Sequence, residues 1–247
     1  MKYTPDDGKS ILLIGDSGTH KTWFIGTCPK PFIFDFDKGL AILRDQETFD
    51  YATFKDAPYG SKLFNKEKGI YEWGTAWPAF LLKLNEIGAA VEKNESPYQT
   101  LGFDSITTLS MICMNYVLRQ NNRSPSDGPR IQDWGGQIGL LETVMDQLTS
   151  WTAFIKVVTA HIQRDTNLIT QAVEKLPLVT GKLAGKLSIY FDEVWFCDVK
   201  ADAVDGAKRT FYLKTVSDAT FRQAKSRFGV PNETPTSWAS VSQYIKP

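Results

Sequence analysis

A chain of 247 residues is long enough to bury a substantial core and has the length of one large domain. Hydrophobic residues make up 42% of the chain and charged residues 23%, a globular composition that excludes intrinsic disorder. Lysine plus arginine equals aspartate plus glutamate at 28 each, so overall charge cannot hold a nucleic acid and only a local basic patch could do so.

The first ten residues, MKYTPDDGKS, contain no apolar signal region, and no apolar run approaches the length of a membrane span. The three cysteines, Cys28, Cys113 and Cys197, are widely spaced in apolar neighbourhoods, as expected for core thiols in a reducing compartment. We therefore expect a cytoplasmic protein that does not contact a membrane.

The apolar run Ile11–Ile14 is typical of a strand buried on both faces, as in a parallel sheet. Residues 21–28 are predicted to be helical, and residues 32–36 form a second buried strand. Strand, loop, helix and strand within this length indicate a βαβ unit. Residues 46–74 are rich in aromatic, lysine and glycine residues and are predicted to be an irregular or hairpin insertion.

Residues 75–94 read as a helix with Pro78 in its first turn, where proline is tolerated. The rest of the chain is predicted as a strand ending at Asp104-Ser105, a helix at 107–120, a loop at 121–136, a helix at 137–150, a strand at 154–161, a helix at 182–190, and β-rich segments at 193–199 and 210–216. The order predicts one α/β domain over residues 1–247. Its core is doubly wound and mostly parallel, with β additions near the C-terminus.

The sequence GDSGTHKT, between the first strand and the first helix, matches the phosphate-loop pattern G-x-x-x-x-G-K-[ST] at all but one position. Its backbone amides are expected to wrap a triphosphate. Lys21 would reach the β and γ phosphates, and the Thr22 hydroxyl would ligate Mg²⁺. The predicted ATP-binding residues are Gly15, Asp16, Ser17, Gly18, Thr19, His20, Lys21 and Thr22.

His20 stands where the motif expects its last glycine. A side chain there crowds a loop whose amides must approach phosphate oxygens closely, although Gly18 still supplies a permissive position. An accidental Lys-Thr pair at a helix start is the alternative interpretation.

Two aspartates at strand ends are candidate catalytic groups. Asp104 is placed to hold Mg²⁺ through water, or it only caps the next helix. Asp35 and Asp37 follow the second strand, and Asp37 lies further toward the edge where ligands bind, so Asp37 is the candidate base that activates water. A turn-forming role before Lys38 is the alternative for Asp37.

Six stretches, GDSGTHKT, FIFDFDKGL, TLGFDS, VVTAH, PLVTGKLAGKLSIYFDEV and AKSRFG, occur in the order seen in phage RecA-like nucleotide-binding proteins. The chain resembles this class, which includes the Sak-type single-strand annealing ATPases, from about Ser10 to Val241. The resemblance implies a RecA-like P-loop ATPase fold in the host cytoplasm. It also supports Asp37 as the catalytic carboxylate, although glutamate is usual at this place in RecA.

The resemblance also implies roles for three later residues. His161 matches the polar residue that senses the γ-phosphate, and a hydrogen-bonded histidine at a strand edge is the alternative. Lys225 and Arg227 look like the Lys-x-Arg motif of RadA- and DnaB-like proteins, whose cations reach a neighbouring subunit's nucleotide. A solvated basic turn is the alternative for this pair. An arginine finger of this kind requires self-association.

Single-stranded DNA is the expected partner, and two groups of residues are candidates to contact it. Cations and aromatic rings on loops suit phosphate contact and base stacking, although such charges are often only solvated. The first group occupies the place of the RecA-like mobile loops and comprises Arg164, Lys175, Lys182 and Lys186. The second group comprises Arg119, Arg123, Arg130 and Trp134.

The sequence therefore predicts a phage-type ATPase that uses ATP and Mg²⁺, binds single-stranded DNA, and promotes annealing or strand exchange. A phage or host single-strand-binding protein is a further candidate partner. A nucleotide or small-molecule kinase is the first alternative, although no compact arginine-rich lid is evident. A non-hydrolysing, nucleotide-gated assembly protein is the second, and His20 favours it.

Overall fold

The computed structural model describes residues 9–46, 48–93, 95–166, 171, 173–201 and 208–245. In this part of the chain, one large sheet of nine strands forms the centre of the molecule. In spatial order its strands are β13 (Thr234–Pro235), β11 (Arg209–Lys214), β10 (Glu193–Ala201), β1 (Ser10–Gly15), β7 (Ile155–Ala160), β6 (Thr100–Asp104), β2 (Pro31–Asp35) and β3 (Asp50–Thr53), and β12 (Lys225–Ser226) pairs with β10.

Six neighbouring strands from β10 through β3 run parallel, and β11, β12 and β13 add antiparallel pairs on one side. This confirms the α/β fold with a mostly parallel sheet and C-terminal β additions. Because β7 lies between β1 and β6, the ends of three strands meet at one edge of the sheet. Ligands bind at such an edge in open α/β sheets.

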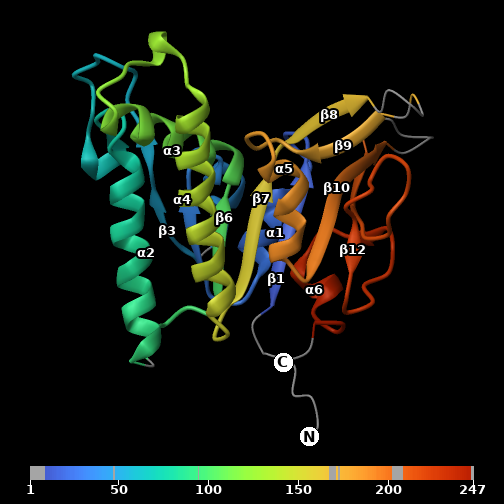
Figure 1. Ribbon diagram of the computed structural model, residues 1–247. Coiled ribbons are helices and arrows are strands. Elements are labelled where there is room, and N and C mark those ends of the chain that lie inside the picture. The colour runs from blue at the N-terminus through green and yellow to red at the C-terminus, as the bar shows by residue number, and fades with distance from the viewer. Residues whose placement is uncertain are drawn as a thin grey trace, which may run out of the picture.

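Helices cover both faces of the sheet (Figure 1). They are α1 (Lys21–Thr27), α2 (Ala76–Glu92), α3 (Ile106–Gln120), α4 (Ile131–Ser150), α5 (Leu183–Lys186) and α6 (Trp238–Val241). Strand β1 shows why both faces need cover: Leu12 and Ile14 join the core under α2, α3 and α4, whereas Ile11 and Leu13 join the core under α1 and α6. Side chains alternate along a strand, so a continuous apolar run buries both of its faces.

The segment predicted as an insertion contributes to the central sheet. Its first strand, β3, pairs in parallel with β2 at the sheet's edge. Strands β4 (Lys55–Asp56) and β5 (Ile70–Tyr71) pair with each other in parallel, so they do not form a hairpin. Two 3₁₀ turns, η1 (Leu40–Leu43) and η2 (Lys66–Lys68), lie before β3 and before β5 respectively.

Helix α4 begins at Ile131, six residues before the start predicted from the sequence. The glycines of the segment 121–136 favoured a loop, but only its first part is one, with a 3₁₀ turn, η3, at Pro125–Asp127. The carboxylate of Asp133 accepts the backbone N–H of Arg130 at 2.6 Å and also binds Arg123 and Asn121. These bonds fix the first turn of α4, so tertiary contacts override the low helix propensity of glycine.

Strands β8 (Ile162–Thr166) and β9 (Val173–Pro177) form an antiparallel pair that the sequence analysis did not predict. The predicted helix at 182–190 is observed as α5 followed by a 3₁₀ turn, η4 (Leu187–Tyr190). The three cysteines are buried free thiols, as expected. Among the described residues, no helix has the length and apolar character needed to cross a bilayer.

Candidate nucleotide site

The predicted phosphate loop connects the end of β1 to the start of α1. Gly18 and His20 both adopt the left-handed backbone conformation, with φ of 76° and 66°. A β-carbon at φ near 60° costs roughly 1–2 kcal/mol, which explains why the motif prefers glycine at the position of His20. The His20 ring lies parallel to Phe211 of β11, with 3.4 Å between ring centroids. Such stacking contributes about 0.5–1.5 kcal/mol, enough to offset much of the strain.

Lys21 is 6% exposed and folds back over the loop. Its ammonium donates to the backbone carbonyls of Gly15 and Asp16, both at 2.8 Å. Burial lowers the pKa of Lys21, and nearby acidic groups oppose this shift. A buried cation bonded only to carbonyl oxygens is well placed to exchange them for the oxygens of an anionic phosphate.

Thr22 and Asp104 form the second part of the site. The Thr22 hydroxyl donates to Oδ2 of Asp104 at 2.7 Å, and Thr159 of β7 donates to Oδ1 at 2.6 Å. Asp104 is 2% exposed, and burial raises the pKa of its carboxyl group. A hydroxyl and a carboxylate in contact are oxygen ligands of the kind that Mg²⁺ takes when phosphates and water complete its shell. These two residues therefore fit the predicted metal.

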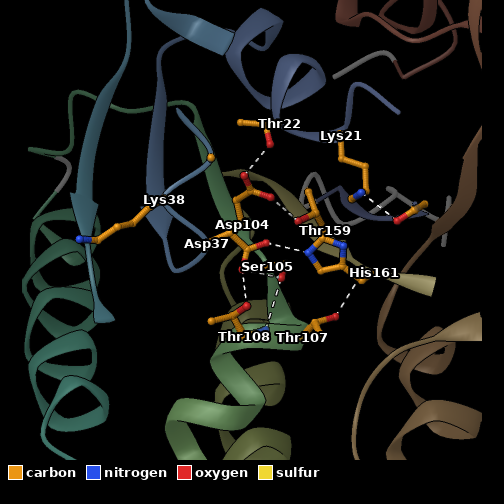
Figure 2. A network of polar contacts seen from close by, with 12 residues as sticks. Lys21, Thr22, Asp37, Lys38, Asp104, Ser105, Thr107, Thr108, Thr159 and His161 are labelled. Atoms are coloured by element: carbon orange, nitrogen blue, oxygen red, sulfur yellow. Dashed lines mark hydrogen bonds and ion pairs between the residues drawn. The ribbon is translucent and has the colours of Figure 1, made fainter. Parts of the chain in front are cut away.

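Asp37 is the centre of a polar network beside Asp104 (Figure 2). Its Oδ1 accepts hydrogen bonds from Ser105, at 3.1 Å, and from Thr108. Its Oδ2 lies 2.9 Å from Nε2 of His161. Burial alone would raise the pKa of Asp37, but the three side-chain hydrogen bonds outweigh burial and hold that pKa below its ordinary value. The carboxylate is therefore ionised at neutral pH.

His161 follows β7 directly and precedes β8. Its backbone N–H donates to the Thr107 hydroxyl at 3.0 Å, which fixes the start of the segment, and its ring reaches Asp37. Figure 2 shows these side chains converging from four separate parts of the chain. Any movement of the Asp37 carboxylate thus reaches the first residue before β8.

Asp35 and Asp37 have different surroundings although they are two residues apart. Asp35 is 3% exposed, and its Oδ1 accepts the backbone N–H groups of Lys38 and Gly39, so it forms the turn after β2. The turn role therefore belongs to Asp35. The side chain of Asp37 instead faces the site.

A cleft of about 640 Å³ connects the phosphate loop to this network. It is lined by Ser17, Gly18, Thr19, His20, Lys21, Thr22, Trp23, Phe36, Asp37, Gly39, Ile42, Lys55, Asp104, Thr108, Met111 and His161. The sequence analysis did not select Ser105, Thr107, Thr108 or Thr159 as site residues. Thr159 stands two residues before His161, and the others follow Asp104, so polar residues beside a strand end were the signal that could have found them.

The candidate DNA-contacting cations lie on two projections of the sheet edge where the cleft opens, the β8–β9 pair and the α3–α4 connection (Figure 1). Most of them have acidic partners within the chain. The pairs are Arg119 with Glu72, Arg123 with Asp133, Arg164 with Asp16, Lys175 with Asp198, and Lys186 with Glu142. Arg130, Lys182 and Trp134 are exposed. The structure therefore brings these residues to one edge but neutralises much of their charge.

Lys225 and Arg227 lie at the opposite edge of the sheet from the phosphate loop. Ser226 pairs with Glu193 at the start of β10, and Glu193 pairs with Ile11 near the start of β1. About four residues of β1, or about 13 Å, separate this level from Gly15. Lys225 donates to the Ser188 carbonyl at 2.7 Å, and Arg227 lies 2.8 Å from Asp192. These cations do not contact the nucleotide cleft of their own chain.

Comparisons with known proteins place this geometry in a family. The AAA domain family matches residues 7–228. No curated protein matches the chain. Among solved structures, the flagellar accessory protein FlaH from Methanocaldococcus jannaschii is 11% identical, with a TM-score of 0.38, over 89% of this chain and 81% of that one. Because the family match spans most of the sequence, this chain belongs to the AAA domain family of P-loop nucleotide-binding ATPases.

Proposed function

We propose that this protein is a Mg²⁺-dependent ATPase that works as an oligomer on single-stranded DNA. One observation carries the ATPase proposal: the phosphate loop and the Asp37–His161 pair line the same cleft. A protein that only bound nucleotide would need the loop. A buried, oriented carboxylate beside the place of the terminal phosphate is what hydrolysis adds.

In this proposal Lys21 binds the β and γ phosphates after leaving the carbonyls of Gly15 and Asp16. Thr22 holds Mg²⁺, and Asp104 supports it through water. When bound, the metal neutralises charge on the phosphate oxygens. Burial of Asp104 makes its negative charge costly without a cation, so nucleotide with metal stabilises this carboxylate.

Asp37 acts on the attacking water. Because its pKa is held below the ordinary value, Asp37 orients the water by accepting its hydrogen bond more than it removes a proton early in the reaction. His161 senses the γ-phosphate through its contact with Asp37. Arg164 of β8 contacts Asp16 of the phosphate loop at 2.6 Å, which gives the β8–β9 pair a second link to nucleotide.

Lys225 and Arg227 complete the site of a neighbouring subunit. Their position at the far edge of the sheet prevents action on their own nucleotide, and the Arg227 side chain is 61% exposed, so a neighbour can reach it. A guanidinium that approaches the γ-phosphate stabilises the charge that develops in the transition state. Assembly is then a condition for hydrolysis.

Binding of single-stranded DNA, with annealing or strand exchange as its outcome, is the finer part of the proposal. Its support is the gathering of basic side chains at the edge where the cleft opens and the link from Arg164 to the phosphate loop. Since most of these cations are paired internally, we expect DNA to displace acidic partners. DNA affinity should therefore depend strongly on salt.

The test is phosphate release from ATP by the purified protein, with and without Mg²⁺ and single-stranded DNA, with particle mass followed in the same samples. We expect Mg²⁺-dependent release that DNA stimulates as the protein assembles. Release that ignores DNA would remove the DNA proposal. Transfer of the γ-phosphate to a nucleoside or nucleotide in place of water would indicate a kinase, and tight ATP binding with no turnover would indicate a nucleotide-gated assembly protein.

A further inference from the structure

The His20 side chain lies in the nucleotide cleft but has no part in holding phosphate. Its imidazole does not cap helix α1, although His20 is the residue at the start of that helix. The ring lines the cleft together with Trp23 and is half-buried. A loop that keeps a strained histidine where glycine fits best has a use for the side chain.

The ring is held in a fixed orientation. Phe211 lies against one face of His20, with 3.4 Å between centroids and 15° between planes. Trp23 comes one helical turn later, with its ring centroid 6.1 Å from that of His20 and a tilt of 42°. Phe211 is not among the residues that line the cleft, so it supports the imidazole from behind. His20 and Trp23 thus form an aromatic corner backed by Phe211.

The strand order places this aromatic corner on the nucleoside side of the loop. Strands β10 and β11 lie on one side of β1, and β7, β6 and β2 lie on the other. Asp37 follows β2 and His161 follows β7, so the γ-phosphate side of the cleft is the β2 side. A triphosphate that runs across the loop away from Asp37 leads its sugar and base toward β11, where Phe211 and His20 lie.

The charge of the aromatic corner also suits a flat, neutral ligand. Burial lowers the pKa of His20, so its imidazole is neutral at pH 7. A neutral heteroaromatic ring stacks on a nucleobase without requiring a counter-charge, and base–aromatic stacking accepts any base while gaining from a larger ring.

We infer that His20 and Trp23 form the surface on which the base of the bound nucleotide stacks, with a preference for purines. This inference rests on the proposed nucleotide binding at the phosphate loop. The residue that departs from the motif then exchanges ease of loop closure for recognition of the base. Nucleoside triphosphates should bind better than a triphosphate that lacks the nucleoside.

The experiment is calorimetric titration of the wild-type protein with MgATP, MgCTP and Mg-tripolyphosphate, repeated with His20→Gly and Trp23→Leu. The ratio of tripolyphosphate to ATP dissociation constants measures the contribution of the nucleoside. We expect His20→Gly and Trp23→Leu each to reduce this ratio about tenfold, with CTP affected less than ATP. Affinity for tripolyphosphate should stay the same or rise in His20→Gly, because glycine relieves the left-handed strain.

Two controls make the result specific. His20→Phe keeps a flat ring in the same conformation and should retain the ATP preference. Tyr51→Ala removes an exposed aromatic residue outside the cleft and should change neither affinity. An unchanged ratio in both His20→Gly and Trp23→Leu, or equal weakening of ATP and tripolyphosphate, would overturn the base-stacking inference alone. A wild-type protein that binds neither triphosphate would overturn the proposed function as well.

Discussion

The phosphate loop and the Asp37 network are two halves of one cleft, and they are built in different ways. The loop consists of eight consecutive residues, Gly15–Thr22, and its main polar contacts are made within that segment. The network takes Asp37 from the end of β2, Ser105 and Thr108 from the start of α3, and His161 from the end of β7. The first half depends on local sequence, and the second depends on strand order.

This difference predicts that binding and hydrolysis can be separated by mutation. A change in the loop removes contacts to the phosphates in the ground state, so it should weaken binding. A change in the network should leave the phosphates bound and affect only the step in which water attacks.

The largest effect is expected for Lys21→Ala. Removal of the buried ammonium deletes the main cation of the loop, and we expect MgATP affinity to fall by about 100-fold or more, beyond detection by calorimetry. Lys66→Ala, which changes an exposed lysine far from the cleft, is the control. Wild-type affinity in Lys21→Ala would exclude the phosphate-loop assignment.

Arg227→Ala tests whether the account needs a second subunit. We expect MgATP binding to persist while the turnover number falls by roughly 10³-fold, the range of an arginine finger. Arg222→Ala is a matched control, because Arg222 and Arg227 are each 61% exposed and each pairs with an acidic side chain. Equal turnover in the two variants would remove Arg227 from the catalytic site.

Asp37→Asn should affect hydrolysis but not binding. The amide keeps the size of the side chain but not its charge, so we expect turnover to fall by about 100-fold with MgATP affinity changed by a small factor. Asp35→Asn, two residues away, changes a turn residue and should retain turnover. Comparison of single-turnover rates and dissociation constants for the pair checks this, and the reverse pattern would assign the base to Asp35.

A smaller effect is expected on acid stability. The pKa of Asp37 is below its ordinary value in the folded protein, so the ionised carboxylate stabilises the fold above about pH 4. That contribution is lost as pH falls through the folded-state pKa. We expect Asp37→Asn to lower the free energy of unfolding by about 1 kcal/mol at pH 6.5 and by less near pH 3.5, measured by urea denaturation. A difference that grows in acid would contradict this sign.

The sequence was sufficient to predict features that depend on neighbouring residues. The GDSGTHKT loop, the buried strands on either side of it and the polar strand ends at Asp37, Asp104 and His161 all follow from local pattern. The structure places all three strand-end residues at one cleft, because parallel strands end at a common edge.

Features that depend on tertiary contact could not be predicted in the same way. The start of α4 relies on the Asp133 carboxylate, which binds groups up to 12 residues earlier. The contact of Phe211 with His20 joins residues far apart in the chain, and no periodicity signals it. The contrast between Asp35 and Asp37 also needed coordinates, since both follow the same strand and alternation alone allows both to face one side.

The central claim is that the two halves of the cleft together hydrolyse ATP. Its most direct test is a single-turnover measurement of γ-labelled ATP mixed with excess wild-type protein and Mg²⁺, beside Lys21→Ala prepared in the same way. The account predicts conversion to ADP and inorganic phosphate by the wild-type protein and none by the variant. Intact ATP held by the assembled wild-type protein throughout, or equal conversion in both samples, would contradict it.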